Sequence, residues 1–156
     1  MIRKAEKQDI PALIELLHQV NDLHADGRPD LFVHGHTKYN ARELEELLGD
    51  EDCPVFVALD NEGAIRGYSF AQIHRNPEGG HLKAHTSLYI DDICVNASCR
   101  GQGVGRSLYE HTEAFARSIG CHNITLNVWA ANTAAQRFYE SLGLSVQKTT
   151  LDRILR

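Results

Sequence analysis

A glycine-rich segment carries the residue types of an anion-binding turn. Glycine occupies positions 101, 103 and 105, after residues 88–95 with strand character and before a stretch with helical periodicity. Glycine lets the backbone approach a ligand closely, and the first turn of a helix offers unpaired N–H groups and a positive dipole end. The segment therefore predicts a site for a phosphate or diphosphate group.

Two common phosphate-binding motifs do not match this segment. A Walker A loop needs a lysine directly after a glycine, and no glycine of this chain is followed by lysine. A dinucleotide fingerprint, Gly-x-Gly-x-x-Gly, would need a third glycine where the chain has Arg106 or Leu108. Both interpretations are excluded.

Other residues near this segment could do acid–base or metal chemistry. Asp91 and Asp92 are adjacent, so in a regular strand they would point to opposite faces, and one of them could line a cleft. The histidine pairs at 34 and 36 and at 81 and 85 have chelating spacing, but no cysteine lies near them, and a structural zinc needs four ligands. We expect no metal. Without a Cys-x-x-Cys pair, the four cysteines are expected to be free thiols.

Hydrophobic periodicity predicts the elements that position these residues. The expected elements are a strand over 2–5, a helix from Ile10 with Asp9 as N-cap, a helix over 41–48, strands over 55–59, 65–74 and 88–95, a helix from the glycines to Gly120, a strand over 124–128, a helix that Asn132 caps and Gly143 ends, and a last strand over 144–150. Residues 24–40 are expected to be irregular. The pattern predicts one α/β domain with a mixed sheet, antiparallel in its first part.

Composition narrows the class of protein. The chain has 156 residues, 42% hydrophobic and 24% charged, with a net charge of −5. This charge argues against a general nucleic-acid binder, which needs a basic footprint. No apolar run reaches the roughly 20 residues of a membrane span, and no signal-peptide core follows the N-terminal basic residues. We expect a cytoplasmic protein without membrane or nucleic-acid partners.

Two motifs together resemble those of the GNAT superfamily of N-acetyltransferases. Arg100-x-x-Gly103-x-Gly105 is similar to its acetyl-CoA pattern, (Gln/Arg)-x-x-Gly-x-(Gly/Ala), and lies between a strand and a helix as that pattern does. Residues 132–144 resemble its second motif, Asn-x-x-Ala-x-x-Phe-Tyr-x-x-Leu-Gly-Phe, with Leu144 in place of the last Phe. The order of elements is also similar, so the resemblance covers essentially the whole chain.

The resemblance implies a fold and a cofactor. The fold would be a single domain over residues 1–156, with a central mixed, mostly antiparallel sheet of about six to seven strands, flanked by about four helices. Two splayed central strands would form the CoA cleft. The acyl donor would be acetyl-CoA, without a metal. Its pantetheine arm would pair with the backbone of Ile93, Cys94 and Val95, and its diphosphate would bind the N–H groups of Gln102, Gly103, Val104, Gly105 and Arg106. Further donor contacts would come from Arg100, Gly101, Asn132 and Tyr139.

The resemblance also implies direct transfer of acetyl to a primary amine. Tyr139 has the register of the general acid that protonates the thiolate, and a backbone N–H near Ile93 or Cys94 could stabilise the oxyanion. Asp92 is the preferred base, with His24, His85 or a chain of waters as alternatives. His24, Arg28 and Asp91 are expected to bind the acceptor, a small-molecule amine or a peptide N-terminus or lysine.

The sequence leaves the functional class, the acyl group and the oligomeric state open. A non-catalytic acyl-CoA-binding or sensing module of the same fold is the alternative from another functional class. An enzyme that uses a longer acyl group is a further possibility. A homodimer is expected only from the family resemblance.

Overall fold

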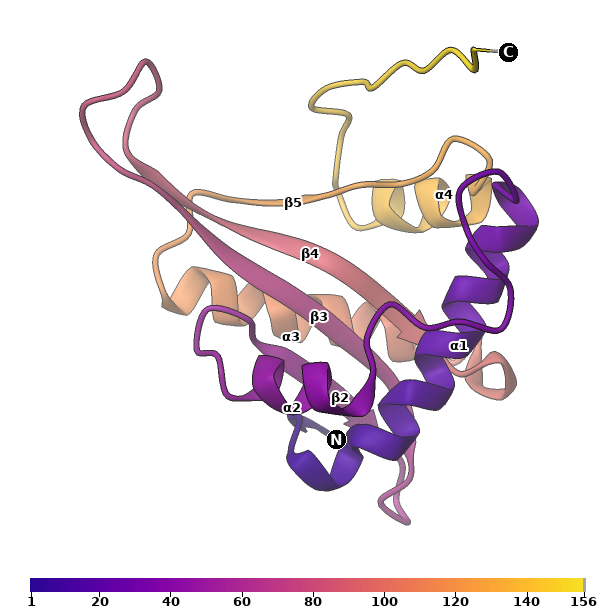
Figure 1. The fold of residues 1–156 in the computed structure, drawn as a ribbon. Helices are drawn as coiled ribbons and strands as arrows, with labels where there is room; N and C mark the ends of the chain where they lie inside the picture. Colours follow the sequence, from indigo (N-terminus) through magenta and orange to yellow (C-terminus); the bar gives the residue numbers. More distant parts are fainter. Residues whose placement is uncertain (156) are drawn as a thin grey trace.

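Five strands form one mixed sheet in the computed structural model, which describes residues 1–155 (Figure 1). In sheet order, which is also chain order, they are β1 (Ile2–Lys4), β2 (Val55–Leu59), β3 (Ile65–Asn76), β4 (His85–Val95) and β5 (Asn123–Leu126). The pairs from β1 to β4 are antiparallel, and β4 and β5 are parallel. The predicted fold class is confirmed.

The predicted number of six to seven strands is wrong for the residues described. The sheet has five strands, and residues 144–155 contain no strand. A strand needs a neighbour for its backbone hydrogen bonds. The C-terminal segment instead runs away from the sheet after α4 (Figure 1), so the predicted strand over 144–150 has no partner strand among the described residues.

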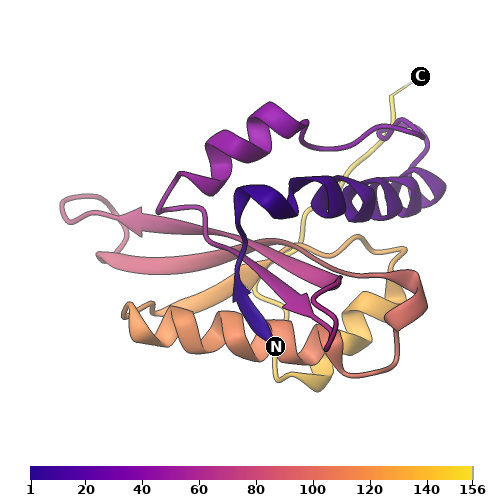
Figure 2. The ribbon, with the colours of Figure 1, turned by 90° about the horizontal axis from the view of Figure 1, so that it is seen from below.

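Helices cover both faces of the sheet (Figure 2). α1 (Ile10–Gly27) and α2 (Ala41–Leu48) lie on one face, and α3 (Val104–Ser118) and α4 (Thr133–Ser141) lie on the other. The short turns η1 (Lys7–Asp9) and η2 (Ala97–Cys99) precede α1 and α3. Within residues 1–155, no helix combines the length and the apolar character needed to cross a membrane.

The first helix differs from the prediction at both ends. It continues through His24 to Gly27, so the expected irregular segment 24–40 is wrong in its first part. Ala25 is fully buried and lies two turns beyond Leu17, which extends the buried face of the helix. At the other end, Asp9 stands at the N-cap position, but its carboxylate does not cap the helix. It accepts hydrogen bonds from the Arg3 guanidinium at 2.7 and 3.0 Å instead.

Two apolar layers hold the helices to the sheet. The larger layer joins α1 and α2 to the face of the sheet that carries Tyr68 and Phe70. On the other face, α3 buries Leu108 and Ala116 against the sheet. The functional segments therefore start from a rigid central pair, β3 and β4, which is packed on both faces.

Gly67 lets β3, β4 and α3 approach one another closely. A Cβ atom at this position would lie 2.6 Å from the Cys94 carbonyl oxygen and 3.1 Å from Leu108 Cδ1. Backbone cannot move away from such a contact without disturbing the sheet.

We expect Gly67→Ala to lower the free energy of unfolding by about 1–3 kcal/mol, the usual cost of overpacking. The matched control is Gly80→Ala, because a Cβ there meets nothing within 4 Å and its φ is not positive. The control should stay within about 0.5 kcal/mol of the parent protein. Urea denaturation of the three proteins measures both values. Equal stability of the two variants would contradict the close approach at Gly67.

Candidate active site

The strands β4 and β5 separate in the middle of the sheet. Their pairing covers only residues 87–90 of β4 and ends at the pair Ile90 and Leu126. The predicted strand over 124–128 is therefore too long at its end, because the chain leaves the sheet after Leu126. β4 continues to Val95 with β3 as its one strand neighbour. Residues 91–95, which include Ile93, Cys94 and Val95, thus present an open strand edge to an extended ligand.

A β-bulge occurs at the point where the strands separate. Phe70 pairs with Asp92 and Ala71 pairs with Ile90, which leaves Asp91 as the extra residue. The bulge changes the expected alternation, so Asp91 and Asp92 both face the side of α1 and α2. Asp91 contacts the segment between these helices, and Asp92 contacts Tyr68 of the core beneath them. The alternation of a regular strand, which would point the two carboxylates to opposite faces, does not apply here for this reason.

The two neighbouring carboxylates have different partners. Lys38 Nζ lies 2.7 Å from each oxygen of Asp91, and the Tyr39 hydroxyl donates to Asp91 at 3.3 Å. Asp92 Oδ2 accepts a hydrogen bond from the Tyr68 hydroxyl at 2.5 Å. Burial raises the pKa of Asp92 to about 6, although the Tyr68 hydrogen bond lowers it. Asp91 is therefore a paired charge, whereas Asp92 can exchange a proton near neutral pH.

Helix α4 brings Tyr139 to the same region. The Asn132 side-chain oxygen accepts a hydrogen bond from the Ala135 N–H at 3.1 Å, which confirms that Asn132 caps this helix. Tyr139 is half-buried. Burial raises the pKa of Tyr139 well above its usual range, and the nearby Asp92 charge raises it further. The phenol is therefore a protonated donor at neutral pH.

The glycine segment forms a turn of free amides before α3. Gly101 and Gly103 have φ angles of +76° and +79°, which favour glycine. Within the described part of the chain, no acceptor takes the backbone N–H groups of residues 102–106. Gly105 has a different reason to be glycine, because a Cβ there would lie 3.3 Å from the Phe138 ring of α4. The same segment therefore offers amides to an anion and holds α4 in place.

Two arginines flank this turn without entering a core. Arg100 and Arg106 are both exposed. Arg106 lies 3.7 Å from Glu110, one helical turn away, which is a weak surface ion pair. Both guanidinium groups are free enough to contact a bound anion.

A cavity of about 300 Å³ lies between the end of α1 and the loop after β5. His24, Arg28, Trp129 and Asn132 line it. The Arg28 guanidinium lies 5.5 Å from the centre of the Trp129 ring and is paired with Asp30 and Asp152 at 2.7 and 3.0 Å. Burial lowers the pKa of His24, with a further contribution from Lys38, so this ring is neutral at neutral pH.

The structure thus brings most of the predicted residues to the region where β4 and β5 separate. His85 is not among them, because it lies at the other end of β4, beside His122. Tyr68, Lys38 and Trp129 line or support the site but were not singled out from the sequence. Only Trp129 had a signal, as the single tryptophan, in the loop before the Asn132 motif.

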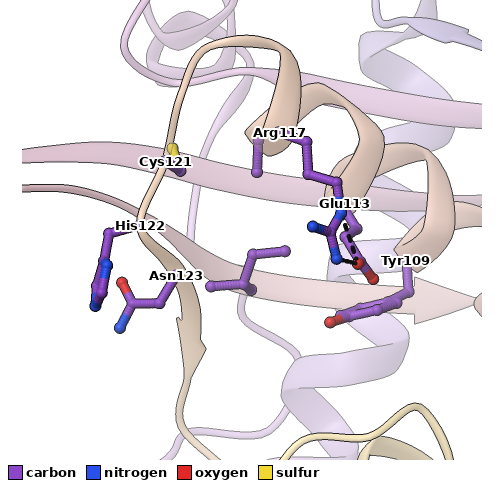
Figure 3. A pocket seen from close by; sticks show the side chains of 8 residues that line it. Tyr109, Glu113, Arg117, Cys121, His122 and Asn123 are labelled. Carbon is purple, nitrogen blue, oxygen red and sulfur yellow. Dashed lines mark hydrogen bonds and ion pairs between the residues drawn. The ribbon is translucent and has the colours of Figure 1, made fainter.

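A smaller hollow of about 170 Å³ lies at the opposite end of β5, against α3 (Figure 3). Tyr109, Arg117, Cys121 and Asn123 line it, and Arg117 is paired with Glu113 of the same helix. None of the predicted site residues reaches this hollow. In residues 1–155, no group of three potential metal ligands comes together, and all four cysteines are free.

The chain is similar in sequence and fold to known proteins. The chain is 34% identical to a mycothiol acetyltransferase from Thermobispora bispora over 126 residues, which are 78% of this chain and 41% of that protein. The chain thus spans less than half of that relative. A mutant of the BH1408 protein from Bacillus halodurans has 29% identity and a TM-score of 0.95, with 100% of this chain and 99% of that chain covered.

A structure of an aminoglycoside N-acetyltransferase in complex with CoA shares the fold. Its TM-score is 0.73 at 20% identity, with 100% of this chain and 99% of that chain covered. The profile of the Acetyltransferase (GNAT) family matches residues 17–144. The chain therefore belongs to the Acetyltransferase (GNAT) family.

Proposed function

We propose that this chain is an acetyl-CoA-dependent N-acetyltransferase that moves acetyl directly to a primary amine. One observation carries the proposal: an open strand edge, a turn of free amides, a carboxylate and a phenol lie around the separation of β4 and β5. Acetyl-CoA would supply an activated acetyl thioester. Membership of the family supports the reaction class.

The chain's own groups fit such a donor. Amides of residues 102–106 would hold the diphosphate, with Arg100 and Arg106 adding positive charge. The edge formed by Ile93, Cys94 and Val95 would pair with the amides of the pantetheine arm. Asn132 uses its side-chain oxygen for the helix cap, so its NH₂ group is the part left to contact the donor.

Two residues would move the protons. Asp92 would take a proton from the acceptor nitrogen as the N–C bond forms, since its pKa of about 6 leaves it ionised at neutral pH. Tyr139 would donate its phenol proton to the sulfur as the C–S bond breaks. The proton on Asp92 can then return to the Tyr139 phenolate, so that both groups are restored for the next turnover. His24, neutral and on the acceptor side, is the rival base.

The acceptor would enter from the cavity beside His24 and Arg28. Asp91 lies on the same face and could orient a second amine or an ammonium group. A small-molecule amine, a peptide N-terminus or a lysine would fit this proposal. Four free cysteines fit a reducing, cytoplasmic compartment.

A panel of amines tests the activity. We expect release of free CoA thiol with at least one primary amine, together with the acetylated product by mass spectrometry. A non-catalytic binding module would bind acetyl-CoA in calorimetry without releasing thiol. That result would contradict the proposed activity.

Tyr139→Phe tests the acid. The variant keeps the ring that packs beside Phe138 but lacks the proton, so we expect kcat to fall by about 10²-fold or more. The dissociation constant for acetyl-CoA should stay within about twofold, because the phenol acts on the leaving sulfur and not on binding. Steady-state kinetics and calorimetry measure the two values. Unchanged kcat would show that Tyr139 is a packing residue.

Asp92→Asn tests the cost of keeping a carboxylate in this place. The folded-state pKa of Asp92 lies above its usual value, so ionisation destabilises the native state as pH rises from about 4 to about 6. The neutral amide avoids this cost. We expect the variant to be more stable than the parent by about 1–2 kcal/mol at pH 8, with a gain that shrinks towards pH 4. Urea denaturation across this pH range measures it, and a pH-independent difference would contradict the raised pKa.

We also infer that two copies of the chain associate through residues 144–155. Val146, Leu151 and Leu155 are 83%, 88% and 86% exposed, and β5 has an unpaired outer edge next to the hollow of Figure 3. An unpaired edge is a template for another strand, and exchange of a terminal segment supplies one. The segment of one copy would cover β5 of the other.

Light scattering after size-exclusion chromatography tests this association. We expect a dimer for the parent protein and a monomer for the double variant Leu151→Asp and Leu155→Asp. The control, Thr149→Asp with Thr150→Asp, adds the same charge at exposed polar positions and should stay dimeric. A monomeric parent protein at micromolar concentration would refute the inference.

A further inference from the structure

The bulge places two carboxylates side by side, and they cannot both be ionised without compensation. In the structure, only one of the two negative charges is paired with a cation. Lys38 contacts both oxygens of Asp91 at 2.7 Å. Within residues 1–155, Asp92 has no ion-pair partner, and its side-chain partner is the Tyr68 phenol. The two carboxylates are therefore distinguished by their partners.

Tyr68 is held rigidly in the main core. Its side chain is 0% exposed, on β3 directly opposite Cys94, and its ring meets Phe70 edge-on at 4.7 Å. Burial raises the pKa of Tyr68 well above its usual range, so the hydroxyl is a permanent donor. A donor that cannot rotate away fixes the atom that it contacts.

That atom is one oxygen of Asp92. The Tyr68 hydroxyl donates to Oδ2 at 2.5 Å. Oδ1 accepts no side-chain hydrogen bond from the described residues, although the Ile93 backbone N–H lies close enough to the carboxylate to lower its pKa, and these residues contain no buried side-chain oxygen without a partner. Oδ1 therefore keeps some accessible surface in this half-buried residue. The carboxylate has one anchored oxygen and one accessible oxygen.

We propose that Tyr68 is a positioning residue, which holds Oδ2 of Asp92 so that Oδ1 faces the incoming amine. This inference rests on the proposed function, in which Asp92 is the base. It assigns to a core tyrosine a role in the reaction that packing alone would not require.

Among the side chains around Asp92, Tyr68 is the one whose hydroxyl can be removed to change the pKa of Asp92. The charge of Asp91 raises the pKa of Asp92, and the charge of Lys38 lowers it. Burial raises the pKa of the Cys94 thiol to about 12, and Tyr139 of α4 is likewise neutral at physiological pH. Removal of the Tyr68 hydroxyl should therefore change the titration of Asp92 more than removal of a neighbouring hydroxyl.

Tyr39 provides a matched control. It also packs against Phe70, with ring centres 5.9 Å apart, and also donates to a carboxylate of the pair, but to Asp91. Tyr39→Phe and Tyr68→Phe each remove one hydroxyl from a ring on Phe70. Only Tyr68→Phe removes the donor to Asp92.

The first measurement needs no activity. The side-chain carboxyl carbon of Asp92 is titrated by ¹³C NMR in the parent protein and in both variants. A hydrogen bond to the ionised form lowers a carboxyl pKa, so Tyr68→Phe should raise the pKa of Asp92 by about one unit, and Tyr39→Phe by much less. If Tyr68→Phe did not fold, 3-fluorotyrosine at position 68, a stronger donor, should shift the pKa downward. An unchanged titration in either test overturns the inference.

The second measurement is the pH profile of kcat/KM with acetyl-CoA and an amine from the panel. With a pKa raised from about 6 to about 7, the ionised fraction of Asp92 at pH 6 falls from about one half to about one tenth. We expect Tyr68→Phe to lose about fivefold more activity at pH 6 than at pH 9, with KM for acetyl-CoA unchanged. A structural role would lower activity equally at all pH values.

The outcomes separate this inference from the proposed function. If the parent enzyme is active but Tyr68→Phe leaves the pKa of Asp92 unchanged, this inference alone is overturned. A shifted titration with an unshifted kinetic profile shows that Asp92 is not the base, and overturns the positioning role. A parent protein that transfers acetyl to no amine overturns the proposed function and this role with it.

Discussion

The separation of β4 from β5 after Ile90 is the constraint on which the rest of the site depends. A strand inside a sheet uses its backbone groups on both sides, and β4 does so only in its first part. Beyond Ile90 its outer edge is open, and the bulge at Asp91 turns two consecutive carboxylates to one face. Because β5 leaves the sheet here, the chain continues to Trp129 and then to α4, which carries Tyr139. The separation of the two strands thus exposes the backbone edge of β4, accompanies the bulge that orients the two carboxylates, and allows α4 to position the Tyr139 phenol.

The electrostatics of the site show a cost that packing does not require. Lys38 neutralises Asp91, whereas Asp92 is half-buried beside a phenol and has a raised pKa. A neutral side chain would fit the same space with less penalty. Groups that are stabilised less than they could be are common at functional sites, where a proton must be exchanged. The asymmetry between the two carboxylates is therefore the part of the structure that chemistry explains best.

Much of the fold could be predicted from local patterns. The helix over Ala41–Leu48 follows from its amphipathic periodicity, and Asn132 follows from the capping preference of its side chain. The turn of free amides after β4 could be predicted from its glycines, because the preference of glycine for positive φ angles is a local property. The end of α1 was harder to predict, because the burial of Ala25 in the last turns of the helix depends on the tertiary structure.

The features that could not be predicted from the sequence depend on contacts between segments far apart in the chain. No residue type marks the bulge at Asp91, so the shared face of the carboxylates depended on the register with β3. Tyr68 lies in a hydrophobic strand, and its sequence context predicts a core residue. Its hydrogen-bond partner, Asp92, is 24 positions away in the sequence. The C-terminal segment has the alternation of a strand, but among residues 1–155 it pairs with no strand, although β5 has an open edge. Sequence patterns carry local preference and cannot supply these partners.

Backbone NMR of the ¹⁵N-labelled protein during titration with acetyl-CoA tests the central claim most directly, because it reports the location of binding without an acceptor. We expect saturable shifts of the amides of residues 93–95 and 102–106, with little change around Tyr109 and Cys121. Shifts confined to the hollow between α3 and β5, or no shifts in a folded protein, would contradict it.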